Sequence, residues 1–313
     1  MRVIFMGTPE FAVPSLRALI AGKYEIAAVF TQPDRPAGRG QKSHSSPIKE
    51  LALEHGLPVY QPEKVRGEEH RPLFDRLKAD FIVVVAYGQI LPVWLLQAAR
   101  IAPVNVHGSL LPKYRGAAPV IWALLNGEPG TGVTTMLMDE HLDTGPVLLR
   151  SEVQIPESMT AGELARDLSR LGAELLIPTL EGLLDNTLRP MPQDETQASF
   201  APRVSKQQAE VSWTCPAREI HNRIRAFNPW PLAFTAFRGR RLQLLSSRPA
   251  EEAAEPGTPP GSYLGPTHSG LLIQCGAGSA LEILELQPAD RRPISGREFV
   301  NGARVSRGDS PFR

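Results

Sequence analysis

Short apolar runs alternate with longer mixed stretches through the first part of the chain. The runs are rich in β-branched residues, and the stretches between them are long enough to hold helices. We predict strands at residues 3–6, 26–30, 81–86 and 104–106, and helices at residues 12–21, 46–54 and 119–126. Strands that alternate with helices are typical of an α/β fold, here a mostly parallel, Rossmann-like sheet with helices on both faces.

The pattern changes after a polar, proline-containing stretch at residues 185–202. Ahead of it we predict two further strands, at 133–138 and 147–153, and a long helix at 160–184. Beyond it come short apolar runs separated by Gly and Pro, at residues 232–237, 242–246, 271–274 and 281–286. Such runs are typical of a small β-barrel domain, and the Pro- and Gly-rich segment 249–266 predicts a surface loop.

The length of 313 residues also favours two domains. We place the first domain at residues 1–188, a linker at 189–205 and the β-barrel domain at 206–313.

Composition narrows the functional classes. No apolar run is long enough to cross a bilayer, and the first strand gives way to Gly7 too early for a signal peptide, so we expect a cytoplasmic protein. Cys215 and Cys275 lack CxxC spacing and are too few for a disulfide framework or a thiolate zinc site, which makes them candidate buried fillers.

Charge is distributed unevenly along the chain. Residues 204–313 hold 14 Lys and Arg against 10 Asp and Glu, whereas residues 1–203 hold 20 against 23. This bias is compatible with a polyanionic partner, but a solvated surface of mixed charge gives similar counts.

The candidate chemistry lies where the strand at 104–106 runs into a loop. Side chains alternate along a strand, so Asn105 and His107 share one face near its carboxyl end. An amide donor can stabilise oxygen charge in a tetrahedral intermediate, and an imidazole can move protons near neutral pH, so the pair suits acyl transfer. The alternative is a structural histidine with an asparagine that ties down a turn.

A third polar residue strengthens the first interpretation. Asp143 lies in a loop after another predicted strand and could orient the imidazole or accept a proton from an attacking amine through water. Alone, it would more simply order the turn before Gly145. Two cofactor classes are disfavoured, because Gly7-Thr8-Pro9-Glu10 departs from GxGxxG and the chain has no Walker A sequence.

Several longer strings resemble the methionyl-tRNA formyltransferase family over nearly the whole chain. They are MGTPEFAVPSL, DRPAGRG, NVHGSLLPKYRGAAPV, LDTGPVL and AFNPWP, in that order and at about the expected spacing. The resemblance implies a formyltransferase catalytic domain in which Asn105, His107 and Asp143 are the catalytic set. Those three residues alone would indicate the wider family of 10-formyltetrahydrofolate-dependent transferases and hydrolases.

The same resemblance implies that 10-formyltetrahydrofolate donates the formyl group, with no metal and no nucleotide. The folate site it implies is formed by Ser109, Leu110, Leu111, Pro112, Tyr87, Gly88 and Gln89. Backbone groups in such loops can bind the edges of a pterin while apolar side chains cover its faces. From the residues alone, Leu110-Leu111-Pro112 could be a hydrophobic loop cap.

Initiator methionyl-tRNA is the acceptor that the resemblance implies. The basic, Gly-rich loop at residues 34–49 would enter the acceptor end of the tRNA, with Arg35, Arg39 and Lys42 among its contacts, although composition alone fits an ordinary exposed loop. The barrel domain resembles an oligonucleotide-binding fold that supports the tRNA. Its candidate phosphate contacts are Lys206, Arg218, Arg223, Arg225, Arg238, Arg240 and Arg241.

Two departures from the family pattern concern the loops. The string SHSSPIKE after Gln41 is more polar than the sequence commonly found there in the family. His141 stands where the family more often has glycine. We expect Trp230, in Asn228-Pro229-Trp230-Pro231, to be packed in a structural turn.

Two other functions remain open on the sequence. One is a formyltransferase that acts on a different amine, such as an amino-sugar nucleotide, and the other is a non-catalytic RNA-binding protein. The inserted basic loop and the C-terminal domain argue against the first, and the three polar residues argue against the second. We expect a monomer with no membrane partner.

Overall fold

Two units make up the chain in the computed structural model, which describes residues 1–22, 24–37, 42–250 and 253–312. The first unit comprises Met1–Pro119, Gly130–Gln154 and Ala165–Pro202. The second comprises Val120–Pro129, Ile155–Leu164 and the chain from Arg203 onward. Among the residues described, no helix combines the length and the apolar character that a bilayer span needs.

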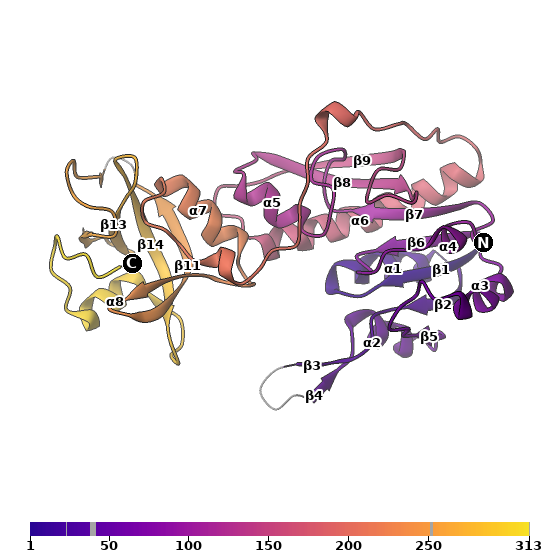
Figure 1. Cartoon of the computed structure of the whole chain (residues 1–313), viewed down its shortest axis with the longest axis horizontal. Helices are drawn as coiled ribbons and strands as arrows, with labels where there is room; N and C mark the ends of the chain where they lie inside the picture. The colour runs from indigo at the N-terminus through magenta and orange to yellow at the C-terminus, as the bar shows by residue number, and fades with distance from the viewer. Residues whose placement is uncertain (23, 38–41, 251–252, 313) are drawn as a thin grey trace. The chain divides into compact units, whose positions relative to one another are not determined.

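A seven-stranded sheet in the order β5-β2-β1-β6-β7-β8-β9 forms the centre of the first unit (Figure 1). Its strands are β1 (Arg2–Gly7), β2 (Glu25–Phe30), β5 (Val59–Tyr60), β6 (Phe81–Val85), β7 (Ala102–His107), β8 (Gly130–Leu137) and β9 (Val147–Gln154). Neighbours from β5 to β7 are parallel, and β8 and β9 add two antiparallel pairings. The predicted, mostly parallel sheet is confirmed.

Helices cover this sheet on both faces, as predicted. They are α1 (Val13–Ala21), α2 (Pro47–Glu54), α3 (Arg71–Leu77), α4 (Val93–Leu96) and the larger part of α6 (Ala161–Leu184). A further helix, α5 (Pro119–Leu125), lies mainly in the second unit. On one face, Ile4 of β1 and Ile82 of β6 belong to a buried cluster with Phe74 of α3. On the other, Gly172 of α6 lies so close to the sheet that an added Cβ would come within 2.7 Å of Val106.

Local sequence signals explain where two of these helices begin. The Ser46 hydroxyl accepts a hydrogen bond from Lys49 N at 3.1 Å, so Ser46 caps α2. Thr160 and Glu163 form reciprocal bonds at the start of α6, with Thr160 N donating to Glu163 Oε2 at 2.8 Å. Such caps satisfy backbone N–H groups that have no partner inside the helix.

A narrow ribbon interrupts the first unit between β2 and α2. It is formed by the antiparallel strands β3 (Arg35–Ala37) and β4 (Lys42–His44), next to α2 in Figure 1. At its base, the Asp34 carboxylate accepts hydrogen bonds from Lys49 Nζ at 2.5 Å and Gln61 Nε2 at 2.7 Å. The two ends of the basic segment at residues 34–49 are therefore joined by the contact between Asp34 and Lys49.

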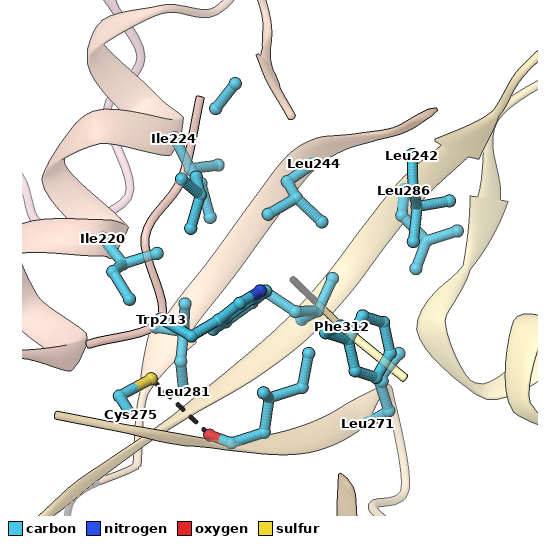
Figure 2. Close-up of a cluster of buried hydrophobic side chains, with 14 of the residues drawn as sticks. Trp213, Ile220, Ile224, Leu242, Leu244, Leu271, Cys275, Leu281, Leu286 and Phe312 are labelled. Carbon is cyan, nitrogen blue, oxygen red and sulfur yellow. Dashed lines mark hydrogen bonds between the residues drawn. The ribbon is translucent and has the colours of Figure 1, made fainter. Parts of the chain in front are cut away.

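The second unit is built on an antiparallel sheet in the order β10-β11-β14-β13-β12, with β15 paired to β14. Its elements are β10 (Ala233–Phe237), β11 (Arg240–Pro249), β12 (Tyr263–Pro266), β13 (Leu271–Cys275), β14 (Ser279–Pro288), β15 (Ile294–Ser295), α7 (Ala217–Ala226) and α8 (Gly296–Ala303). The sheet forms the small barrel-like domain that the sequence predicts. Figure 2 shows its core, where Trp213 and Ile220 pack against Leu244 and Leu281.

Three predictions for this unit need correction or extension. The segment 249–266 is not a loop at its end, because Tyr263 and Leu264 are buried and Tyr263 pairs with Ile273 of β13. The side chain of Trp230 is 51% exposed, so the expectation that it is packed is wrong. Two helices, α7 and α8, form where none was predicted. Of the two cysteines, Cys275 is buried as expected, and Cys215 is partly buried.

His221 on α7 is a buried histidine that joins two other segments of the second unit. Its Nε2 lies 2.9 Å from the carbonyl oxygen of Glu157, which can only accept, and its Nδ1 lies 3.0 Å from the Ser247 hydroxyl. Burial lowers the pKa of His221, an effect that the hydrogen bond to the Glu157 carbonyl opposes. The folded state therefore keeps this imidazole neutral under conditions in which the unfolded chain protonates it.

We predict that the second unit loses stability as pH falls through the ordinary histidine pKa of about 6.5, because the unfolded state then binds a proton that folded His221 does not. Urea unfolding between pH 8 and 5 measures this dependence. His221→Gln should flatten it, and substitution of the exposed His268 by Gln should leave it unchanged. An equal slope in wild type and His221→Gln would contradict the prediction.

Candidate active site

Asn105, His107 and Asp143 meet at one place in the first unit. Asn105 and His107 lie at the carboxyl end of β7, and Asp143 lies in the loop between β8 and β9. The Asn105 amide donates to Asp143 Oδ1 at 3.5 Å, and His107 Nδ1 lies 3.7 Å from Asp143 Oδ2. Asn105 and His107 are 8% and 6% exposed, so the cluster is largely shielded from water.

The surroundings of His107 define its hydrogen-bonding state. Its Nε2 lies 2.9 Å from the backbone oxygen of Tyr114, which can only accept, so Nε2 carries a hydrogen and donates. In the neutral ring, Nδ1 is then the unprotonated nitrogen, and it faces Asp143. The geometry makes Nδ1 the atom that can take a proton, and the Asp143 carboxylate would stabilise the resulting imidazolium.

The loop after β7 supplies one more contact to this cluster. Gly116 N donates to Asp143 Oδ2 at 2.8 Å. The backbone φ angle is 62° at Tyr114 and 123° at Gly116, and both values lie in the positive range that residues other than glycine rarely adopt. The loop therefore turns so that a carbonyl faces His107 while an N–H faces Asp143.

Residues 191–201, which we call the strap, run beside the loop at residues 112–118. Arg115 N donates to Ser199 O at 2.8 Å, and Ala201 N donates to Arg115 O at 2.7 Å. The side-chain amide of Gln193 donates to the backbone oxygens of Asp143 and Gly145. Sequence reasoning singled out neither Arg115 nor Gln193, since nothing local to residues 185–202 signals contact with the β8–β9 loop.

The residues expected to bind folate fall into two groups. Ser109, Leu111 and Pro112 are buried, and the Ser109 hydroxyl donates to Lys113 O at 2.6 Å, whereas Leu110 is partly exposed. After β6, Tyr87 is buried in the core, with no hydrogen-bond partner for its hydroxyl among the described residues. Gly88 is exposed, and Gln89 is partly exposed like Leu110.

Gln89 has a structural part in the same region. Its side chain accepts from Val65 N at 2.8 Å and donates to Pro62 O at 3.1 Å, so its amide is already bonded. The following residue, Ile90, is 80% exposed and presents an apolar side chain at the loop after β6. An aromatic ligand ring would find an apolar surface there.

The structure describes only some of the side chains that are expected to contact tRNA, and these differ in exposure. Arg35 and Lys206 are exposed. Arg39 and the side chain of Lys42 lie outside the described residues. Arg225 is buried, and its guanidinium bonds Asn222 Oδ1 at 3.0 Å, so it is a structural residue in place of the surface contact expected.

The other arginines of the second unit lie nearer the surface. Arg241 stacks over the Phe234 ring at 3.7 Å, and Arg238 donates to two carbonyls of the chain near α8. Arg218 pairs with Glu157 at 3.1 Å, and Arg223 donates to Gln208 O. Arg240 is exposed.

Comparison with known proteins identifies the family of this sequence. The pattern of the family described as formyl transferase matches residues 1–180, and that of the formyl transferase C-terminal domain matches residues 203–304. A methionyl-tRNA formyltransferase of Acetivibrio thermocellus is 45% identical over 309 residues, which cover 99% of each chain. One of Methylococcus capsulatus is 47% identical over 301 residues and 96% of each chain.

Solved structures of similar fold are more distant in sequence. An N-formyltransferase of Helicobacter canadensis, described in complex with folinic acid and dTDP-3-aminofucose, is 20% identical. The matched region covers 90% of this chain and 98% of the Helicobacter canadensis chain, with a TM-score of 0.67. This likeness concerns the fold.

We predict that Gly116→Ala destabilises the first unit by about 1–3 kcal/mol, because alanine is strained at this φ angle and its Cβ would lie 2.7 Å from Ala201 O. Chemical denaturation of wild type and variant measures the difference. The control is Gly302→Ala in α8, where an added Cβ meets no described atom within 4 Å and should cost nothing. Equal midpoints for wild type and Gly116→Ala would refute the strain.

Proposed function

This chain belongs to the methionyl-tRNA formyltransferase family and transfers a formyl group to the methionine of initiator methionyl-tRNA; from that premise we propose that Asn105, His107 and Asp143 carry the chemistry. The observation that carries the proposal is the position of His107. Its Nε2 is held by the Tyr114 carbonyl, and its Nδ1 faces the Asp143 carboxylate. The product, formylmethionyl-tRNA, serves translation initiation.

Formyl transfer requires a nucleophilic amine and a stabilised oxyanion. The neutral α-amine of the methionyl ester attacks the formyl carbon, a C–N bond forms, and the carbonyl electron pair moves to oxygen. Asn105 Nδ2 stabilises that oxygen by hydrogen bonding, and His107 can do the same only from a protonated Nδ1, because its Nε2 hydrogen is bonded to the Tyr114 carbonyl. Asp143 assists removal of the ammonium proton through water, after which the original C–N bond breaks and a proton returns to the leaving nitrogen.

The formyl donor in this proposal is 10-formyltetrahydrofolate, whose N10 supplies an activated formyl group. Ile90 is exposed and Leu110 is partly exposed, and apolar side chains of this kind suit contact with an aromatic ring system. Ser109, Leu111, Pro112 and Tyr87 are buried, so in this proposal they shape the folate site through their backbone. Gly88 and Gln89 likewise contribute backbone groups.

The tRNA contacts are proposed from charge and position. Arg35, Arg39 and Lys42 belong to the segment that includes the β3–β4 ribbon, and basic side chains on such a ribbon suit the phosphates of a tRNA acceptor end. Lys206 is an exposed cation at the start of the second unit's main segment. The division into a catalytic domain at 1–188, a linker at 189–205 and a tRNA-binding domain at 206–313 stays a prediction, as do a monomeric state and a cytoplasmic location.

An amino-sugar nucleotide is the second acceptor to be considered, because the Helicobacter canadensis structure of similar fold is described with dTDP-3-aminofucose. That protein is 20% identical to this chain, whereas the methionyl-tRNA formyltransferases are 45–47% identical over nearly the full length. The relatives therefore favour methionyl-tRNA.

We predict that Asn105→Ala, His107→Ala and Asp143→Ala each lower kcat/KM by about 100- to 10,000-fold, because each removes a group that acts in the transition state. Thermal unfolding should stay close to that of wild type. His141→Gly is the matched control, since His141 is exposed in the same loop, and it should retain activity within a few-fold. Near-normal activity in all three alanine variants would refute the assignment.

We predict that the purified protein converts methionyl initiator tRNA and 10-formyltetrahydrofolate into formylmethionyl-tRNA, detected by mass. Elongator methionyl-tRNA, free methionine and an amino-sugar nucleotide are the control acceptors. Selective formylation of the initiator tRNA supports the proposal. If the protein binds a formylfolate analogue but leaves the initiator tRNA unmodified, the acceptor is a different amine.

A further inference from the structure

Gln193 uses every hydrogen-bonding group of its side chain within the first unit. Its amide nitrogen donates to Asp143 O at 2.9 Å and to Gly145 O at 2.7 Å, one hydrogen to each carbonyl. Its amide oxygen accepts from Arg115 Nε at 3.1 Å and from Arg115 Nη2 at 2.8 Å. One side chain of the strap therefore joins the loop that carries Asp143 to the loop that follows His107.

The buried side chain of Arg115 holds Gln193 in this arrangement. It is 2% exposed, and its guanidinium forms two parallel hydrogen bonds with the Glu195 carboxylate, at 2.8 Å and 2.7 Å. Its backbone pairs with Ser199 and Ala201 of the strap. Because the guanidinium is held at both Gln193 and Glu195, the amide of Gln193 has little freedom to rotate away from the Asp143 loop.

The backbone of the Asp143 loop needs such support. Asp143 has a φ angle of 56°, in the left-handed region that non-glycine residues seldom occupy. A residue in a sparsely populated region of this kind persists where its surroundings over-determine it. Gln193 holds the carbonyls of residues 143 and 145, while Gly116 N holds the Asp143 carboxylate itself.

The other end of the loop is held by Asp139. Its carboxylate accepts hydrogen bonds from the Thr144 hydroxyl at 2.8 Å and from His141 N at 3.1 Å. These contacts lie within the loop, whereas the contacts of Gln193 come from a segment about 50 residues away in the sequence. Gln193 is thus the side chain through which the strap fixes the loop relative to β7.

We propose that Gln193 is a positioning residue for formyl transfer, held by Arg115, that keeps the Asp143 loop in the left-handed conformation which sets the carboxylate beside His107 and Asn105. The proposal rests on the proposed catalytic function of Asp143. Loss of the two donor hydrogens of Gln193 allows the carboxylate to move, and a displacement of about 1 Å at a reacting centre can lower the rate by about 100-fold.

The first test compares Gln193→Met with Gln197→Met in the initiator-tRNA formylation assay. Methionine keeps the length of the side chain and removes its hydrogen bonds, and Gln197 is an exposed strap residue whose amide donates to Asp194. We expect Gln193→Met to lower kcat at least 10-fold with KM for both substrates changed less than 3-fold, and Gln197→Met to match wild type. Wild-type kcat in a folded Gln193→Met protein overturns the proposal.

A double-mutant cycle separates positioning of Asp143 from a general structural role. If Gln193 acts through the Asp143 carboxylate, Gln193→Met lowers kcat in wild type but has no further effect in Asp143→Ala. Equal losses in both backgrounds would show that Gln193 acts elsewhere and would overturn the proposal. The comparison of wild type with Asp143→Ala tests the proposed catalytic function without any change at Gln193. Failure of that function can therefore be distinguished from failure of the role proposed for Gln193.

Gln193→Glu covers the case in which Gln193→Met does not fold. A glutamate keeps the acceptor for Arg115 and removes both donors to the Asp143 loop. We expect wild-type binding of 5-formyltetrahydrofolate, a thermal midpoint close to wild type and a kcat lowered at least 10-fold. Full kcat with the same midpoint would overturn the proposal.

Discussion

The carboxylate of Asp143 accepts a hydrogen bond from Gly116 N, lies 3.7 Å from the His107 imidazole and faces the amide of Asn105. The rest of the site depends on this placement, because a carboxylate stabilises an imidazolium only when it is close and correctly oriented. Asp143 holds this position with a φ angle of 56°, a backbone conformation that is unfavourable for a non-glycine residue. The loops and the strap around it supply the compensating hydrogen bonds.

The sheet of the first unit positions Asn105 and His107, which lie on β7. β7 lies between β6 and β8, and both neighbours pair with Asn105, so its backbone has little freedom to move. Helices pack on both faces of the sheet, and the close approach of Gly172 to Val106 places α6 directly behind β7. Catalytic side chains on a strand end are positioned more firmly than side chains on a free loop.

The second unit has its own core. Trp213 and the apolar residues of α7, β11, β13 and β14 form one buried cluster, and Trp213 donates its indole hydrogen to Thr235 at 2.9 Å. Much of the excess positive charge at residues 204–313 is committed to contacts inside this unit, as for the buried Arg225. The exposed Arg240 and Lys206 are the kind of group that a polyanion can contact.

The sequence by itself determined the periodic features of this protein, because strands, helices and their spacing are local properties. The strands β1, β6 and β7, the helix α2 and the face shared by Asn105 and His107 were all predicted from local pattern. It could not determine the strand at Tyr263, which forms because tertiary pairing with β13 overrides a Pro- and Gly-rich local pattern. The exposure of Trp230, the burial of Arg225 and the clamp of Gln193 on the Asp143 loop are likewise products of the tertiary structure alone. Each depends on contacts between residues distant in sequence, and no local pattern encodes which of them will meet.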